Sequence, residues 1–221
     1  MILGIAAFLL SSTALAGNQA VVQELVGEVW AVDAEGVRRQ LVLGTEVATS
    51  ETLHTGTGSR VVLAFDDDSR FELGADAAML VRHYVFKPRD PESRLVTRIF
   101  RGAFRFVSGA IARLRGEGMR VELSVATIGI RGTRVAGEAD ATSARVMLLE
   151  PEDDPARYTA IEVSNSFGSV VVDKPGWGTE VPDEYSPPTP PRRMQLDSIN
   201  RLNRSMQTIR RVITPRMRPG M

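Results

Sequence analysis

Hydrophobic and polar residues alternate in many short segments between Ala20 and Val181. Residues 60–65 and 70–73 are two such segments, and the polar run Asp66-Asp67-Asp68-Ser69 connects them as a hairpin would. Further strands are expected within 21–30, 78–86, 95–107, 119–135, 144–149, 158–163 and 169–172, with 95–107 forming one long strand or a hairpin interrupted at Gly102. Many short strands at regular spacing predict an all-β fold, either a β-sandwich or a jelly-roll-like coil.

Helical periodicity is absent before Pro187, and residues 110–114 form at most one turn. Beyond Val181 the proline-rich residues 182–191 predict a stiff, extended linker. In residues 192–221 apolar side chains recur at spacings of three and four, which predicts an amphipathic helix. Its apolar stripe consists of Leu196, Ile199, Leu202, Met206, Ile209 and Ile213. The chain is thus expected to contain a β domain over residues 20–181, a linker and a helical tail.

The N-terminus has the features of an export signal. An uncharged apolar run from Ile2 to Leu10 precedes Ala14-Leu15-Ala16, the arrangement of small residues that signal peptidase cleaves. We expect residues 1–16 to be removed after Ala16 and the product to be periplasmic or secreted. No Lys or Arg precedes the run, so either the true start lies upstream or the α-amino group alone supplies the charge; a buried N-terminal strand is the alternative. No later apolar run is long enough to span a membrane.

Cysteine is absent, so packing without disulfides must stabilise the domain, and a lipid attached through Cys is excluded. The formal net charge is zero, but eight Arg and one Asp from Thr189 onward give that part +7 and leave −7 on the rest. Four tail arginines accompany the apolar stripe: Arg201, Arg204, Arg210 and Arg211. The tail therefore suits a protein partner or self-association, an anionic envelope surface, or a solvated and partly disordered state. Nucleic acid is not expected as a partner of an exported protein.

The segment 125–135 interrupts a strand-like pattern with two glycines and two arginines. Ile128 and Ile130 are expected on the buried face, with Gly129 and Arg131 on the other. Gly132 can adopt the positive φ that a bulge requires, and Gly129 admits a close neighbour. Arg131 can bind a carboxylate of Asp66–Asp68 or Asp153–Asp154. We expect Gly129, Arg131, Gly132 and Thr133 to fix a strand crossing, with contact to a ligand or partner as the alternative.

Five groups of residues, in this order, resemble motifs of the FecR domain family. They are Leu43-Gly44 with 52–61, then 63–69, 101–104, 126–133, and lastly 168–172 with 175–179. Asp67 or Asp68 stands where the family usually has a hairpin glycine, and Ser124 where a proline often precedes the Gly-x-Arg-Gly-Thr motif. Aspartate tolerates left-handed geometry, so these departures affect local turns and not the fold. The resemblance covers about Leu25 to Val181.

The resemblance implies a non-catalytic extracytoplasmic β domain. The best-known members of the family sense the signalling domain of an iron-siderophore receptor and control a sigma factor. Those members carry a cytoplasmic helical domain and a transmembrane helix before the β domain, and this chain shows neither. We therefore expect it to be similar to the free-standing exported FecR-domain proteins, which do not signal to the cytoplasm by that route.

Catalytic chemistry has little support in the sequence. His54 and His83 are the only histidines, and two histidines without cysteine are a weak basis for a metal site. No nucleophile elbow or nucleophile–base spacing is visible. The acidic run Asp66–Asp68 is expected to be a solvated turn, since it lacks the ligand spacing of a calcium loop. We expect no enzyme activity, no cofactor and no metal.

Three functions remain in order of preference. The first is a non-catalytic binding, scaffold or signalling module that contacts an envelope protein. The second is a domain that binds an envelope polysaccharide or a small ligand, which exposed aromatic residues such as Trp30 or Trp177 beside a groove would favour. The third and weakest is a cupin-like metal enzyme, which would need converging His and carboxylate side chains.

Overall fold

The computed structural model describes residues 19–114, 117–151 and 158–196, which form mainly β-strands and one short helix, α1 (Ala110–Leu114). The predicted all-β class is therefore confirmed, and so is the limit of one helical turn at residues 110–114. The strands are β1 (Ala20–Val26), β2 (Val29–Val32), β3 (Arg38–Gln40), β4 (Glu46–Val47), β5 (Thr52–Thr55), β6 (Arg60–Ala64), β7 (Arg70–Leu73), β8 (Ala78–Val85), β9 (Arg94–Val107), β10 (Met119–Glu122), β11 (Thr127–Arg131), β12 (Arg134–Ala139), β13 (Ala144–Leu149), β14 (Ala160–Asn165), β15 (Gly168–Val172), β16 (Trp177–Val181) and β17 (Arg192–Arg193).

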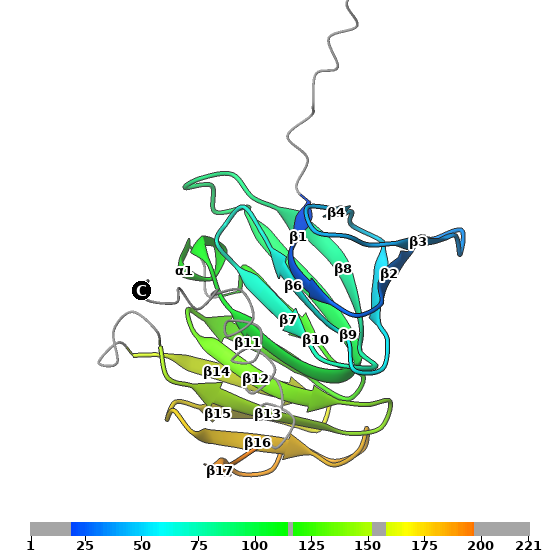
Figure 1. Ribbon diagram of the computed structural model, residues 1–221. Helices are drawn as coiled ribbons and strands as arrows, with labels where there is room; N and C mark the ends of the chain where they lie inside the picture. Colours follow the sequence, from blue (N-terminus) through cyan, green and yellow to red (C-terminus); the bar gives the residue numbers. More distant parts are fainter. Residues whose placement is uncertain (1–18, 115–116, 152–157, 197–221) are drawn as a thin grey trace, which may run out of the picture.

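The strands form two sheets that face each other and share β9. Sheet A has the order β4-β1-β6-β7-β9-β12-β13-β16-β17. Sheet B has the order β3-β2-β5-β8-β9-β10-β11-β14-β15. Among these pairings only β9–β10 is parallel. Apart from β4 and β3, which lie outside β1 and β2 at the first edges, both sheets follow chain order, so the strands stack from the N-terminal blue end to the C-terminal orange end in Figure 1.

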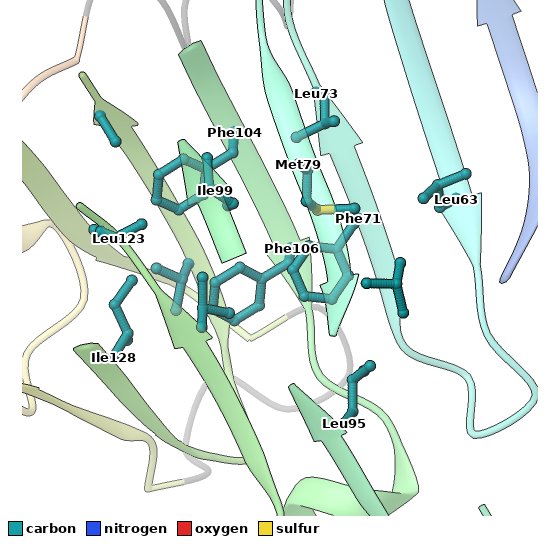
Figure 2. Packing of buried hydrophobic residues seen from close by; sticks show 14 of the residues in the cluster. Leu63, Phe71, Leu73, Met79, Leu95, Ile99, Phe104, Phe106, Leu123 and Ile128 are labelled. Atoms are coloured by element: carbon teal, nitrogen blue, oxygen red, sulfur yellow. The ribbon is translucent and has the colours of Figure 1, made fainter. Parts of the chain in front are cut away.

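The core lies between the two sheets because each strand places alternate side chains inward. Phe71, Phe104 and Phe106 enter it from sheet A, and Met79 and Ile99 enter it from sheet B (Figure 2). The rings of Phe71 and Phe106 stack with centroids 5.1 Å apart. The packed aromatic layer is what a chain without disulfides needs for stability.

The strand β9 crosses from one sheet to the other. Its first half pairs with β8 and β10 in sheet B, and its second half pairs with β7 and β12 in sheet A. Gly102 lies at the change with φ of 103°, and a Cβ atom there would be 2.4 Å from the Cβ of Ala77. Only glycine fits both requirements. Of the two alternatives for residues 95–107, the structure has the single long strand, bent at Gly102.

Residues 182–196 pack along the C-terminal end of sheet A. The Thr189 amide donates to the Glu180 carbonyl at 2.9 Å, and the Thr179 hydroxyl donates to the Thr189 carbonyl at 2.6 Å. Arg192 and Arg193 then pair with β16 as β17, and Leu196 is 2% exposed. The proline-rich segment therefore lies against the β domain. Residues 192–196 contain the strand β17 and no helix, so the prediction of a helix from residue 192 is wrong for these five residues. The rest of the predicted tail helix and the predicted signal peptide lie outside the described residues.

Candidate functional site

The Gly-Ile-Arg-Gly-Thr motif lies where the chain passes from sheet B to sheet A. Ile128 and Ile130 of β11 have no exposed surface and belong to the core, as the alternation predicts. Gly129 and Arg131 face outward from sheet B. Gly132 and Thr133 connect β11 to β12 of sheet A.

Gly132 turns the chain between the sheets. Its φ is 57°, the left-handed region that was predicted, but β11 pairs with β10 and β14 without a register shift, so the feature is a corner and not a bulge. The Thr133 amide donates to the Ser108 hydroxyl at 2.7 Å, and the Ser108 amide donates to the Thr133 carbonyl at 3.0 Å. Both residues are buried, so these bonds hold the corner against the end of β9.

Gly129 forms the floor of a hollow on the outer face of sheet B. Register places Arg120 of β10, Gly129 of β11, Glu162 of β14 and Val171 of β15 in one row across the sheet. A hollow of about 550 Å³ lies over this row, and Gly129 contributes no side chain to fill it. A Cβ on Gly129 would meet only Glu162 atoms at 3.8 and 3.9 Å, so the close neighbour expected at Gly129 is not found.

Arg131 also lines the hollow and is exposed. Within the described ranges it forms no ion pair, and neither does Arg120 on the other side of Gly129. The expected pairing of Arg131 with Asp66–Asp68 is therefore wrong. Asp153 and Asp154 lie outside the described residues. Two guanidinium groups without a bound carboxylate are available to an anionic group at this surface.

Asp67 holds the β6–β7 hairpin onto α1 instead. It is 1% exposed, and its carboxylate accepts bonds from the Ser69 hydroxyl at 2.9 Å and the Ile111 amide at 3.1 Å. Burial, together with the nearby carboxylates of Asp67 and Asp66, raises the pKa of Tyr84. The prediction of a solvated turn is wrong for Asp67, while Asp68 does take the positive φ, 66°, expected of a residue in the place of glycine. Asp67 thus has a structural role in this turn.

The aromatic residue beside the hollow is Tyr158, which is 71% exposed. It was not predicted from the sequence, because nothing local distinguishes Tyr158, which lies just before β14, from its neighbours. Trp30 is half-buried, stacks on His54 with centroids 5.4 Å apart and has the Arg38 guanidinium 4.0 Å above its ring. Trp177 packs against the core. Neither tryptophan lines the hollow.

The two histidines do not converge. His54 of β5 stacks on Trp30 of β2, and His83 is exposed on β8. Burial first, and then the positive charges of Arg101 and Arg38, lowers the pKa of His54. Across the described part of the chain, no three His, Asp or Glu side chains gather as metal ligands would.

A larger hollow of about 750 Å³ lies on sheet A, where Arg105, Arg134 and Leu149 face Met194 of the C-terminal segment. Arg192 in this segment forms an ion pair with Glu180 at 2.8 Å. The predicted contact residues Arg201, Arg204, Arg210 and Arg211 lie outside the described residues. In the ranges that the structure describes, no helix is long and apolar enough to cross a membrane.

These features define a two-sheet β domain with a corner motif and an open, charged hollow on one sheet. The family model described as FecR protein matches residues 51–151, which run from the start of β5 past the end of β13. The predicted FecR resemblance is therefore confirmed, and the match includes the corner motif.

Two crystal structures of a candidate anti-sigma factor from Parabacteroides distasonis ATCC 8503 are similar to this chain. One shares 13% identity at a TM-score of 0.49 and covers 69% of this chain; the other shares 14% at 0.49 and covers 67%. This chain covers 64% and 62% of those proteins, less than two thirds of their length. No curated protein matches the chain.

Proposed function

We propose that the protein is a non-catalytic regulatory module outside the cytoplasm that binds an envelope protein through the outer face of sheet B. The observation that carries the proposal is the hollow over Gly129, flanked by Arg120 and Arg131, neither of which has an ion-pair partner among the described residues. The FecR match supports a signalling role, because the resemblance implies domains that sense other envelope proteins.

The hollow suits an extended acidic segment of a partner. It lies next to β15, the outermost strand of sheet B, where Val171 is 54% exposed. An edge strand offers unpaired backbone groups to a further strand. Glu117 and Glu162 also line the hollow, so it is the two guanidinium groups at its flanks, and not its net charge, that offer bidentate sites for a partner's carboxylates.

The test is capture of envelope proteins by the full-length chain and by charge-reversal variants. We expect Arg120→Glu/Arg131→Glu to lose a protein that the wild type retains. The matched control is Arg70→Glu, an exposed arginine on β7 of sheet A, which should retain it. Recovery of the same proteins by all three forms would contradict the proposal.

A polysaccharide ligand is the second candidate, since the exposed ring of Tyr158 beside the hollow offers a surface on which a sugar can stack. Retention on immobilised envelope polysaccharide that Tyr158→Ala abolishes would favour this candidate over a protein partner.

The proposed location outside the cytoplasm has a separate test. We expect the exported protein to begin at Gly17, as mass spectrometry of its N-terminal peptide would show.

A further inference from the structure

One row of outward-facing residues crosses sheet A and is unusually buried. Register pairs each member with the next: Val62, Glu72, Arg105, Ala136, Met147 and Gly178. Val62 is 8% exposed, Glu72 4%, Ala136 0% and Met147 9%. In an antiparallel sheet with one solvated face, the outward-facing residues are usually polar and exposed to solvent. The outer face of sheet A is therefore covered along this row.

The C-terminal segment covers one end of the row. The Met194 amide donates to the Gly176 carbonyl at 3.1 Å, next to β16. Two residues later, Leu196 packs against Ala136 of β12 and Met147 of β13. The chain thus runs from β16 across β13 to β12, and its direction leads toward β9, β7 and β6.

The length of the remaining chain matches the rest of the row. From Met147 to Val62 the row crosses four strand spacings, about 19 Å at roughly 4.8 Å each. A helix from residue 197 to Ile209 is about 18 Å long at roughly 1.5 Å per residue. Leu196 is also the first residue of the apolar stripe, so the stripe begins already seated on the row.

We propose that residues 197–213 of the same molecule form a helix that lies along this row with its apolar stripe against sheet A. This inference does not depend on the proposed partner site. At 100° per residue, Leu202, Met206 and Ile209 face the sheet while Arg204 and Arg211 face solvent. Within the row, the Glu72 carboxylate is paired with Arg105 and lies 3.5 Å from the buried guanidinium of Arg60, so this charge is already compensated on the surface that the helix would cover.

A single spin label tests the placement, because the chain has no other cysteine. A nitroxide on Thr208→Cys lies on the predicted solvent side, about 18 Å along the helix from Leu196. We expect the backbone amide signals of β6 and β7 to lose intensity in the full-length protein and those of β14 and β15 to keep it. A mixture of labelled protein and isotope-enriched, unlabelled protein shows whether the effect arises within one molecule.

A stripe variant and a matched control complete the experiment. Leu202→Asp/Ile209→Asp should restore the β6 and β7 signals and lower Tm by about 10 °C, since two apolar side chains leave the interface. Asn200→Asp/Arg204→Asp, on the opposite side of the helix, should change neither. The proposal is overturned if the wild type shows no attenuation at β6 and β7, or if attenuation appears equally in the mixture, which would indicate a second copy as the occupant.

Discussion

Alanine at the two glycines of the corner motif is expected to change stability in opposite directions. Gly132 has φ of 57°, where an L-residue costs about 1–2 kcal/mol. For a domain of this size that cost lowers Tm by about 5 °C. Gly129 lies in β11 without positive φ, and its Cβ would meet only ordinary contacts at 3.8 Å or more. Alanine there should raise stability by about 0.5 kcal/mol, because glycine in a strand loses more conformational entropy on folding.

Urea unfolding followed by circular dichroism measures both differences. Gly36→Ala is the control, since Gly36 has φ of 83° in the turn before β3 and no atom within 4 Å of the added Cβ. The stability that Gly36→Ala loses measures the cost of a positive φ at alanine without any steric contact. We expect Gly132→Ala to lose at least as much, because the Ser108–Thr133 bonds depend on the same corner.

The same pair of positions separates folding from binding. Gly129→Leu should project into the hollow and weaken partner capture while the protein stays folded, whereas Gly132→Ala should keep capture at temperatures where it remains folded. The reasoning is refuted if Gly132→Ala is as stable as the wild type, or if Gly129→Ala is less stable by more than about 1 kcal/mol.

Two further predictions concern buried polar groups. Asp67→Ala leaves the Ile111 amide without its acceptor and should reduce the free energy of unfolding by about 3 kcal/mol in urea, whereas the exposed Asp66→Ala should change it little; equal effects would show that burial of Asp67 is unimportant. His54 has a pKa lowered from 6.5 by burial and then by Arg101 and Arg38, so its contribution to stability is present above pH 6.5 and is lost as pH falls below that value. His54→Phe keeps an aromatic ring against Trp30 and should weaken the fall in Tm between pH 7.5 and 5.5; an unchanged pH dependence would contradict this assignment.

Local patterns were enough for most of the sheet. Alternation and turn residues predict the β6–β7 hairpin, and the two isoleucines of β11 are buried as their spacing requires. The choice between a hairpin and one strand at residues 95–107 depends on long-range pairing. Gly102 is a turn signal in either case, and only the approach of Ala77 shows that it bends a continuous strand.

The hollow could not be predicted because it depends on register. Arg120, Gly129 and Glu162 are neighbours only when β10, β11 and β14 pair as they do, and a shift of one residue would turn Gly129 inward. The burial of Asp67 likewise depends on α1, which follows it by more than 40 residues. The packing of residues 182–196 on sheet A had no local signal, since prolines indicate an extended chain but not what it contacts.

The outer face of sheet A is buried where the outer face of sheet B is exposed, and this difference links the proposed tail helix to the proposed partner site. On sheet A the row through Ala136 is buried, and the described chain enters it at Leu196. On sheet B the row through Gly129 leaves Val171 54% exposed, and Arg131, two residues further along β11, is exposed as well. A helix that occupies sheet A removes that face from contact with other molecules and directs a partner to sheet B. Its stripe would then serve the fold, while its outward arginines stay available as a second, weaker contact for an acidic partner bound at the sheet B hollow.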